Sequence, residues 1–335
     1  MSHKLLHYCA ALLLGLGLFA VETVHAKITC TNISISNVTF GNVDPQSSQT
    51  DVTATLSFTC KTNLAIPSLY DSATLCFSIG ESYGAPIDPR HMYDTVNNTL
   101  AFQLYQNSTH SIIWGSQFHD TATPLMRNIT LRGSYLPEGG TSMTGTATMY
   151  GRVRAGQQTA IPGSYTNTYT TSDTAITVNS TPGLTPPGMC SSTQSGYLGS
   201  FIVSANVVKK CTVTARPLDF GNAGLLLSSV FATTSIDLQC SRTTPYNVGL
   251  DAGQNGSGNI NARKMVLGAN SVVYQLYKDA ARTVVWGDSV GIGTGTVAGT
   301  GTGFMQNIPV YGTVPAQLTP PAGTYTDTIV VTVTY

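Results

Sequence analysis

The chain has 335 residues, a length that suggests two ordinary domains, and its formal net charge is zero. Charged residues make up only 10% of the sequence, so it lacks the basic surface that nucleic acid or an anionic membrane would require. Hydrophobic residues reach 41%, which excludes a disordered chain, and Gly, Thr, Ser and Asn fill much of the rest. This composition is typical of many short strands joined by turns.

Residues 1–26 have the pattern of a secretory signal peptide. Lys4 gives a basic start, Ala10 to Ala20 is a short apolar run, and Val24-His25-Ala26 is an acceptable cleavage site. The alternative is an N-terminal membrane anchor, although the apolar run is short for a bilayer span. We expect a mature protein that begins at Lys27 and folds in an oxidising compartment.

Two parts of the chain carry the same segments in the same order, so the protein contains one module twice. The segments are Phe40-Gly41-Asn42 and Phe220-Gly221-Asn222, Arg90-His91-Met92 and Arg263-Lys264-Met265, Phe102-Gln103-Leu104-Tyr105 and Tyr274-Gln275-Leu276-Tyr277, Trp114-Gly115 and Trp286-Gly287, Tyr150-Gly151 and Tyr311-Gly312, and Gly163-Ser164-Tyr165 and Gly323-Thr324-Tyr325.

The cysteines predict a disulfide framework. There are seven, and Cys9 leaves with the signal peptide, so an even number remains. Two pairs occupy matching places in the repeat, and the last two cysteines are left for each other. Zinc is the alternative, but neither a C-x-x-C pair nor suitably spaced histidines are present, and we expect no metal. The predicted disulfides are Cys30–Cys60, Cys211–Cys240 and Cys76–Cys190.

Almost no segment outside the signal peptide has a helical pattern of apolar residues. Short alternating segments separated by Gly, Asn, Ser and Pro predict an all-β fold of two tandem Ig-like β-sandwich domains. We expect an N-terminal domain at 27–180, a linker rich in Pro and Gly at 181–196, and a C-terminal domain at 197–335.

The second copy resembles a known family at Tyr274-Gln275-Leu276-Tyr277-Lys278-Asp279, Trp286-Gly287-Asp288 and Gly323-Thr324-Tyr325-Thr326-Asp327-Thr328. This is the spore coat protein U domain family, whose members include pilin subunits of archaic chaperone–usher pili. The first copy is looser, with Ser116 where the second has Asp288, and its loops are longer. The resemblance implies a tip adhesin of such a pilus, exported through the periplasm to the cell surface, with a divergent first domain and a pilin domain second.

The C-terminal segment predicts a strand with one face in a core, because Ile329, Val331, Val333 and Tyr335 alternate mainly with threonine. A long apolar edge strand is an aggregation hazard unless something pairs with it. The resemblance implies an incomplete sandwich that accepts a donor strand at this edge. The implied partners are a periplasmic pilus chaperone, then an adjacent pilin subunit, with assembly at an outer-membrane usher.

Phe201–Val207 alternates in the same way, and we expect it to pair within this chain, with completion of the first domain as one outcome. Only Lys27-Ile28-Thr29 precede Cys30 after cleavage, which is too short for a strand given to another subunit. The expectation is therefore a protein at the fibre tip that accepts a strand but donates none.

Two loops of the first module are longer than their counterparts and carry Leu, Ile and Tyr beside Pro. Exposed apolar clusters mark interaction surfaces, whereas the alternative is packing as small satellite clusters. Strand alternation predicts that Leu64–Tyr70 and Ala160–Gly163 lie far from the linker. Neutral charge favours apolar contact with an abiotic surface, and a host surface is the other possibility. The candidate surface-binding residues are Leu64, Ile66, Pro67, Leu69, Tyr70, Tyr135, Leu136, Pro137, Ala160 and Ile161.

Enzyme motifs are weak. Gly80-Glu81-Ser82-Tyr83-Gly84 matches a nucleophile elbow, but Pro86 and Pro89 follow where a helix is required. Gly293–Ala298 matches a loose dinucleotide fingerprint without a helix, and acidic residues for glycoside chemistry are sparse. We expect no enzyme and no cofactor. The predicted function is an adhesive tip subunit, and the alternative is a secreted structural or coat protein built from the same domains.

Overall fold

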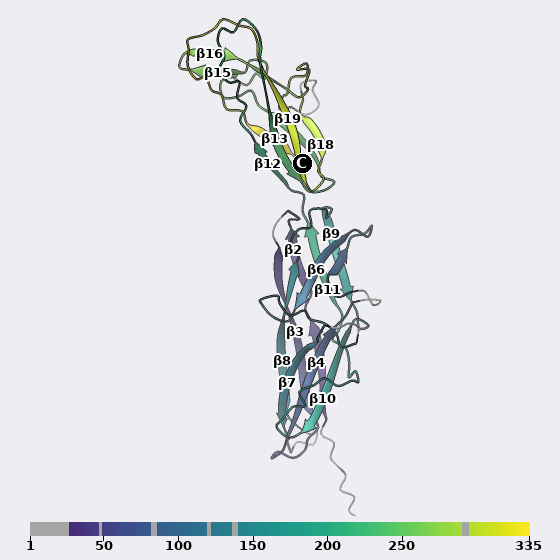
Figure 1. Ribbon diagram of the computed structural model, residues 1–335. Helices are drawn as coiled ribbons and strands as arrows, with labels where there is room; N and C mark the ends of the chain where they lie inside the picture. The colour runs from purple at the N-terminus through teal and green to yellow at the C-terminus, as the bar shows by residue number, and fades with distance from the viewer. Residues whose placement is uncertain (1–26, 47–48, 82–85, 119–121, 136–139, 290–294) are drawn as a thin grey trace, which may run out of the picture.

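The computed structural model describes residues 27–46, 49–81, 86–118, 122–135, 140–289 and 295–335. These residues form strands and turns without a helix, in two lobes stacked end to end (Figure 1). The expected all-β, two-sandwich fold is confirmed. Accordingly, the described ranges contain no helix long and apolar enough to cross a membrane.

The first lobe is a sandwich of an eight-stranded sheet, in the order β1-β3-β8-β6-β5-β9-β11-β2, and a three-stranded sheet, β10-β4-β7. Phe58 of β3 and Phe77 of β4 meet between the sheets with ring centroids 5.0 Å apart. The strands are β1 Ile28–Ile35, β2 Val38–Val43, β3 Thr50–Thr62, β4 Tyr70–Ile79, β5 Arg90–Tyr93, β6 Thr99–Tyr105, β7 Leu125–Arg132, β8 Ser142–Val153, β9 Gly163–Tyr169, β10 Thr174–Pro182 and β11 Phe201–Val207.

Strand β11 completes this first sandwich. It pairs antiparallel with β9 and parallel with β2, and the side chains of Phe201, Val203, Ala205 and Val207 are buried in the first core. The prediction that this segment pairs within the chain is confirmed. The expected domain boundary at 196/197 is wrong by this pairing, because the first sandwich extends to Val207.

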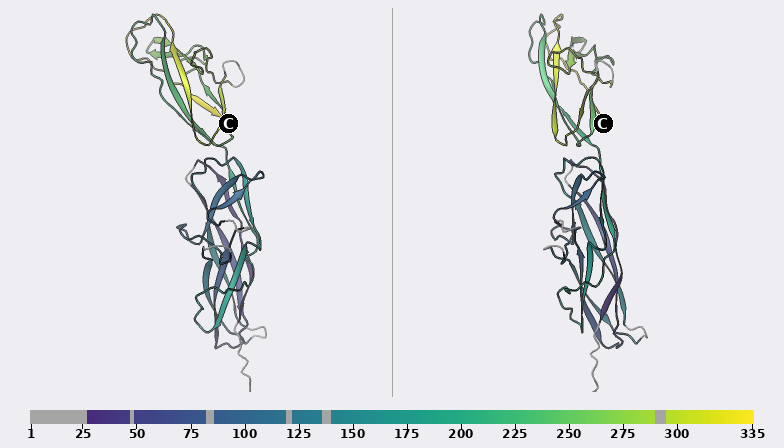
Figure 2. Two further views of the ribbon diagram at one scale, coloured as in Figure 1. Left: turned by 45° about the vertical axis from the view of Figure 1, so that its right-hand side comes forward. Right: turned by 90° about the vertical axis from the view of Figure 1, so that its right-hand side faces the viewer.

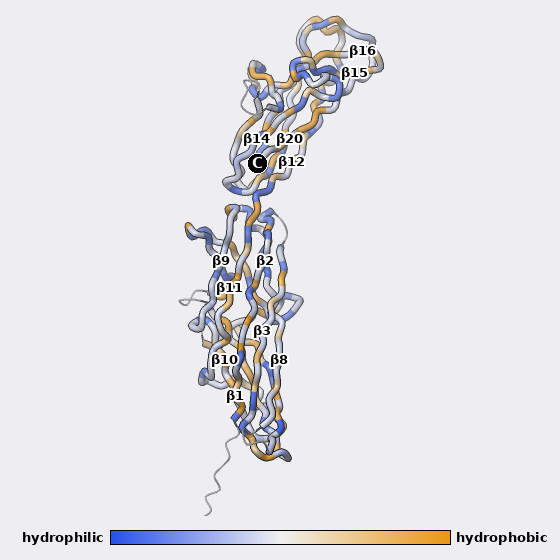
Figure 3. Tube along the Cα trace, turned by 180° about the vertical axis from the view of Figure 1, so that it is seen from behind, coloured by the Kyte–Doolittle hydropathy of each residue, from blue (hydrophilic) through white to orange (hydrophobic). Residues whose placement is uncertain are grey.

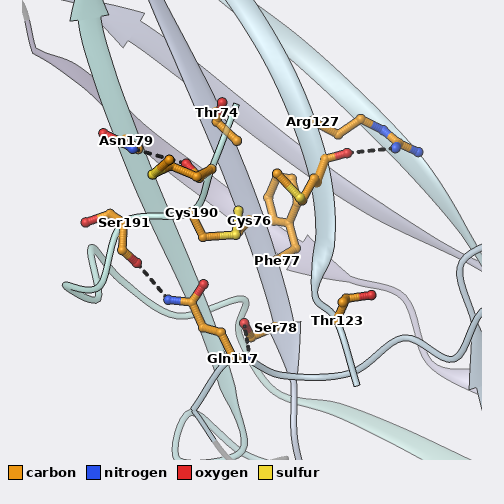
Figure 4. Close-up of a disulfide and its surroundings, with 12 residues drawn as sticks. Thr74, Cys76, Phe77, Ser78, Gln117, Thr123, Arg127, Asn179, Cys190 and Ser191 are labelled. Atoms are coloured by element: carbon orange, nitrogen blue, oxygen red, sulfur yellow. Dashed lines mark hydrogen bonds between the residues drawn. A yellow bond between two sulfur atoms is a disulfide. The ribbon is translucent and has the colours of Figure 1, made fainter. Parts of the chain in front are cut away.

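The segment 183–200, which contains most of the predicted interdomain linker 181–196, instead returns along the first sandwich from β10 to β11. The Gly183 amide donates to the Tyr70 carbonyl at 2.7 Å, and the Ser195 amide donates to the Ile176 carbonyl at 2.8 Å. The disulfide Cys76–Cys190 fixes its middle to β4 (Figure 4). Nearby, Gln117 donates to the Ser191 carbonyl at 2.7 Å.

The second lobe is smaller, with sheets β12-β13-β19-β17 and β18-β14-β20 and a separate hairpin β15–β16. Its core is built around Trp286, Leu238 and Val248, which are fully buried. The strands are β12 Cys211–Ala215, β13 Val230–Cys240, β14 Pro245–Leu250, β15 Lys264–Leu267, β16 Asn270–Val273, β17 Gln275–Tyr277, β18 Val297–Thr300, β19 Met305–Val314 and β20 Val331–Thr334.

The repeat seen in the sequence is also a repeat of contacts. Trp114 donates its indole N–H to the Phe77 carbonyl at 2.7 Å, and Trp286 donates to the Val248 carbonyl at 2.9 Å. A fully buried arginine in each lobe donates to the carbonyl of that tryptophan. The two lobes therefore share one internal framework.

All three predicted disulfides are formed. Cys30–Cys60 and Cys211–Cys240 each join two directly paired residues, on β1 with β3 and on β12 with β13. These two disulfides occupy the same place in each sandwich, as the repeat predicted.

Only Val208-Lys209-Lys210 separate β11 from β12, so the lobes follow each other closely (Figure 2). Polar contacts join them. Gln46 donates from Nε2 to the Gln239 carbonyl at 3.1 Å, and the Lys210 ammonium pairs with the Asp44 carboxylate. We call this set of contacts the internal junction.

Candidate functional site

The second sandwich contains an open groove of about 830 Å³. One wall is the segment Leu218–Leu226, which follows β12, and the other is Thr319–Tyr325, which precedes β20. Its lining also includes Val230, Met265, Val272 and Val314. The groove therefore reaches apolar side chains of the domain core, while Asp219, Asn222 and Thr324 add polar groups to its walls.

Hydrogen bonds show which parts of the first sandwich correspond to the second wall. Tyr165 donates its hydroxyl to the Ile161 carbonyl at 2.8 Å, and Tyr325 donates to the Pro321 carbonyl at 2.8 Å. Gln157 bonds both the N–H and the C=O of Ala101. Gln317 bonds both groups of Val273 in the same way. The segment before β20 is thus the counterpart of β9.

The first wall is the counterpart of β2, because Phe40-Gly41-Asn42 and Phe220-Gly221-Asn222 match in sequence and Gly41 and Gly221 share positive φ values of 66° and 71°. In the first sandwich, β11 lies between β2 and β9. The groove of the second sandwich is the position that β11 fills in the first.

No strand in the described part of the chain fills this position in the second sandwich. The counterparts of β2 and β9 are themselves not strands there, although their sequences match. A strand needs a neighbour for its backbone N–H and C=O groups, and these walls face the open groove. Their apolar side chains are half-buried at Leu218, Phe220 and Tyr325, whereas Val38, Phe40 and Tyr165 are buried.

The predicted acceptor edge is present as a bare edge. Strand β20 pairs with β14 alone and ends its sheet. Ile329, Val331 and Val333 are half-buried against the core, and Tyr335 is 53% exposed. The sequence predicted this edge, but none of these four residues is among those that line the groove, whose second wall ends at Tyr325. The other wall, around Phe220, was not identified, although the repeated Phe-Gly-Asn motif pointed to it.

Asp327 follows the second wall in the chain, two residues after Tyr325, and its carboxylate is bonded within the domain. Tyr274 donates its hydroxyl to this carboxylate at 2.7 Å, and Asn255 donates at 2.9 Å. Burial and the hydrogen bond to Asp327 raise the pKa of Tyr274 well above its usual value, so the phenol stays protonated. These bonds satisfy the Asp327 carboxylate within the domain.

A second group of exposed apolar side chains lies at the end of the first sandwich opposite the second lobe. Hydrophobic residues are part of the chain at that end (Figure 3). Two loops meet there, because the Gly133 amide donates to the Leu69 carbonyl at 3.0 Å and the Ser134 amide donates to the Leu64 carbonyl at 3.1 Å. We define the distal patch as the exposed side chains of Ile66, Leu69, Tyr135 and Leu184, which are 44%, 48%, 86% and 66% exposed.

The other predicted surface residues divide into three groups. Leu64 is buried and anchors its loop, whereas Pro67 and Tyr70 are half-buried beside the patch. Leu136 and Pro137 lie outside the described residues. The loops therefore combine both predicted alternatives, since one side chain packs inward while Ile66, Leu69 and Tyr135 stay exposed.

The predicted position of Ala160 and Ile161 is wrong. Ala160 is buried, Ile161 is half-buried, and both lie at the internal junction, where Arg242 donates to the neighbouring Thr159 carbonyl at 3.4 Å. The prediction assumed that β10 ends beside the second domain. In the structure the chain turns back after β10, which puts the start of β9 next to the second lobe instead.

Leu184 was missed because it was assigned to an interdomain linker. Its neighbour Gly183 bonds to Tyr70, which brings Leu184 to the same end as the predicted loops. The sequence did contain a signal, because an apolar leucine stands among the Gly, Thr and Pro residues of the segment that was read as a linker.

The described residues contain no cluster of three potential metal ligands. Ser82 of the elbow-like motif and Gly293-Thr294 of the fingerprint-like motif lie outside the described residues. Glu81 has a structural role, because it pairs with buried Arg90 at 3.3 Å and accepts from the Tyr169 hydroxyl at 2.6 Å.

The fold and the groove define a two-domain β-sandwich protein whose second domain is open where its first is complete. The family model of the Spore Coat Protein U domain matches residues 16–172 and 197–332. The chain therefore belongs to the spore coat protein U domain family.

Three known proteins are similar to this chain to different degrees. "Protein U" of Myxococcus xanthus is 32% identical over 112 residues, which cover 32% of this chain and 61% of that protein. A chain of the CsuC–CsuE chaperone–tip adhesion subunit pre-assembly complex, from archaic chaperone–usher Csu pili of Acinetobacter baumannii, superposes with a TM-score of 0.52 at 17% identity, covering 92% of this chain and all of that one. The CupB6 tip adhesin of Pseudomonas aeruginosa covers 92% of this chain and 94% of its own at 9% identity, with a TM-score of only 0.30.

Proposed function

We propose that this protein is the tip adhesin of a chaperone–usher pilus, attached to the fibre through its second domain and to a surface through its first. The observation that carries the proposal is the groove, which stands where β11 stands in the complete domain. A strand from another chain that entered the groove would pair with both walls and cover Leu218, Phe220 and Tyr325.

A chaperone and then a neighbouring subunit are the proposed occupants of the groove. The solved complex of a chaperone with a tip adhesion subunit of similar fold supports this choice. Before assembly, the open edge of β20 and the half-buried core need cover against aggregation, which a periplasmic chaperone supplies.

The tip position is supported by how the chain uses its own donor-like strand. Strand β11 has the alternating apolar residues of a donor strand. It is already paired within the first sandwich, and the chain continues at both of its ends. The distal patch and the groove also lie in different lobes, so one end can bind a surface while the other joins the fibre.

Attachment is assigned to the distal patch. Its members are large apolar side chains, so contact with an apolar surface would release the water that covers them. The same residues do not identify a sugar or other polar ligand.

The test is attachment of pilus-bearing cells to plastic. The variant Ile66→Asp/Leu69→Asp and the variant Tyr135→Asp should each lower attachment about tenfold or more, since a buried apolar side chain contributes about 1.5–3 kcal/mol. Val96→Asp is the matched control, because Val96 is 73% exposed on the turn between β5 and β6. Unchanged attachment with normal surface display would contradict the adhesive role, and immunogold label along the whole shaft would contradict the tip position and favour a structural subunit.

A further inference from the structure

The internal junction shows how one spore coat protein U domain sits on another. Strand β11 runs antiparallel to β9, with Val207 opposite Gly163, and then leads through three residues into β12. The body of the second domain therefore rests on the end of the first domain at which the inserted strand emerges.

Two short segments of the first sandwich receive that body. One is Asp44–Gln46, which pairs with Lys210 and bonds the Gln239 carbonyl. The other is Gln158–Thr159, where Arg242 bonds the Thr159 carbonyl and the backbone of Gln158 leaves no room for a side chain at Gly303.

The same two positions exist at the free end of the second sandwich. Because Gln317 repeats the contacts of Gln157, Leu318-Thr319 are the counterparts of Gln158-Thr159. The segment after Phe220-Gly221-Asn222 corresponds to Asp44–Gln46 and contains Leu225, Leu226 and Leu227.

Three leucines at these positions are exposed to solvent. Leu225 is 72% exposed, Leu227 is 79% exposed and Leu318 is 96% exposed. They lie together, because the Leu226 amide donates to the Thr319 hydroxyl at 2.8 Å and the Gln317 amide donates to the Leu226 carbonyl at 3.0 Å. We call Leu225, Leu227 and Leu318 the terminal leucines.

We propose that the terminal leucines are the docking surface for the body of the next pilus subunit, the one whose strand fills the groove. This inference rests on the proposed function. A strand oriented like β11 would end opposite Gly323, the counterpart of Gly163, and its domain would emerge directly over Leu318. Solvent-exposed leucines clustered at such a point mark an interface.

The difference between the two junctions has a physical reason. The internal junction joins two covalently linked domains, so polar contacts such as Asp44–Lys210 suffice to orient them. The external junction joins separate chains, and burial of apolar side chains adds a driving force that does not depend on salt. The occupant is therefore expected to present apolar residues where the second domain presents Lys210, Gln239 and Arg242.

The experiment compares two probes on the full-length protein bound to its chaperone. One probe is a synthetic peptide of the main pilus subunit's N-terminal strand, and the other is the whole main subunit bound to its chaperone. The test variant is Leu227→Lys/Leu318→Lys, because Leu225 also lines the groove and is left unchanged. This double variant should take up the peptide at the wild-type rate but form the complex with the whole subunit about tenfold more slowly. Leu184→Lys, an exposed leucine in the other lobe, is the control and should match wild type for both probes.

The outcomes separate the two proposals. Equal uptake of the whole subunit by wild type and the double variant would overturn the docking surface while leaving the groove in place. An equal loss with both probes would also overturn it, because the leucines would then act on the groove itself. Failure of wild type to accept even the peptide would reject the proposed function and the docking surface with it.

Discussion

At the scale of single residues, the first sandwich depends on a buried arginine. Arg90 is fully buried and donates to the carbonyls of Trp114 at 2.9 Å and Ile79 at 2.8 Å. Its guanidinium also pairs with Glu81, whose side chain is almost fully buried. Three chain segments are therefore tied to one side chain, which explains why the Arg recurs as Arg263 in the second sandwich.

Arg90→Met should lower the free energy of unfolding of the first sandwich by about 3 kcal/mol or more, because it leaves Glu81 charged and unpaired in the interior. Arg154→Met is the control, since Arg154 pairs with Asp88 at the surface and the change should cost less than about 1 kcal/mol. Urea unfolding followed by hydrogen exchange at β4 and β6 amides measures both. Equal losses would show that the buried network contributes no more than a surface pair.

A surface carboxylate gives a pH-dependent prediction. Arg152 donates to both Asp51 oxygens, at 2.6 Å and 2.7 Å, and this hydrogen bonding lowers the pKa of Asp51 from its ordinary value of 3.8. The ion pair thus stabilises the fold above that value, and the contribution disappears as pH falls through the lower pKa of the folded state.

Wild type should be more stable than Asp51→Asn by less than about 1 kcal/mol at neutral pH, because the Asp51 side chain is 39% exposed. The difference should persist down to about pH 4 and vanish toward about pH 2. Urea unfolding across this range is the measurement. A difference that grows as the pH falls would have the wrong sign for this ion pair.

At the scale of elements, β11 is the strand on which the comparison of the two sandwiches depends. Val203→Asp should disrupt the first sandwich by more than about 3 kcal/mol, because Val203 is fully buried and a lone charge there has no partner. Ile202→Asp, one residue away on the 40% exposed face, should shift stability by only about 0.5 kcal/mol.

Hydrogen exchange at the amides of β2 and β9 measures the loss of β11 from the sheet directly, since both strands pair with β11. Fast exchange of both strands is expected in Val203→Asp alone. Similar exchange in the two variants would mean that β11 is not an integral strand of the first sandwich.

Most of the elements could be predicted from the sequence, since alternation, turn residues and the repeat determine the all-β fold and the disulfide pairs. The boundary between the two domains could not be predicted in this way. The segment Pro182–Gly188 has the composition of a linker, and composition does not report that Cys190 and Ser195 bond back onto the first sandwich. The assignment of β11 to the first domain depends on long-range pairing, which local pattern does not reveal.

The candidate sites were predicted in part for the same reason. The apolar loops were identified because Leu69 and Tyr135 stand out in segments that are usually polar. The groove itself was not identified, because the prediction named strand β20, whereas the groove is lined by Leu218–Leu226 and Thr319–Tyr325. These two segments are recognised as its walls only when the two sandwiches are compared in three dimensions. Leu318 has no local signal, and its position over the groove follows from Gln317 alone.

At the scale of the whole molecule, the chain is a stack of two related domains with a different free surface at each end. The first domain has its groove filled by β11 and presents the distal patch. The second domain has an open groove, and the terminal leucines lie beside it. On the proposed function, the first copy of the domain binds a surface and the second copy joins the fibre. The two copies differ in a single strand, because β11 completes the first sandwich and no described strand takes that place in the second.

The most direct test supplies that missing strand from the protein's own sequence. A copy of Gly196–Val207 is attached after Tyr335 through a short flexible linker, so that it can run antiparallel to the segment from Val333 to Gly323 as β11 runs along β9. The control graft carries Ser at the four positions copied from Phe201, Val203, Ala205 and Val207.

Hydrogen exchange of the full-length protein at amides 218–223 and 323–333 is the measurement. We predict strong protection of both walls with the native graft and little or none with the serine graft, because only the apolar face can fill the groove. Walls that exchange equally fast with both grafts would contradict the claim that the second sandwich lacks the strand that β11 supplies to the first.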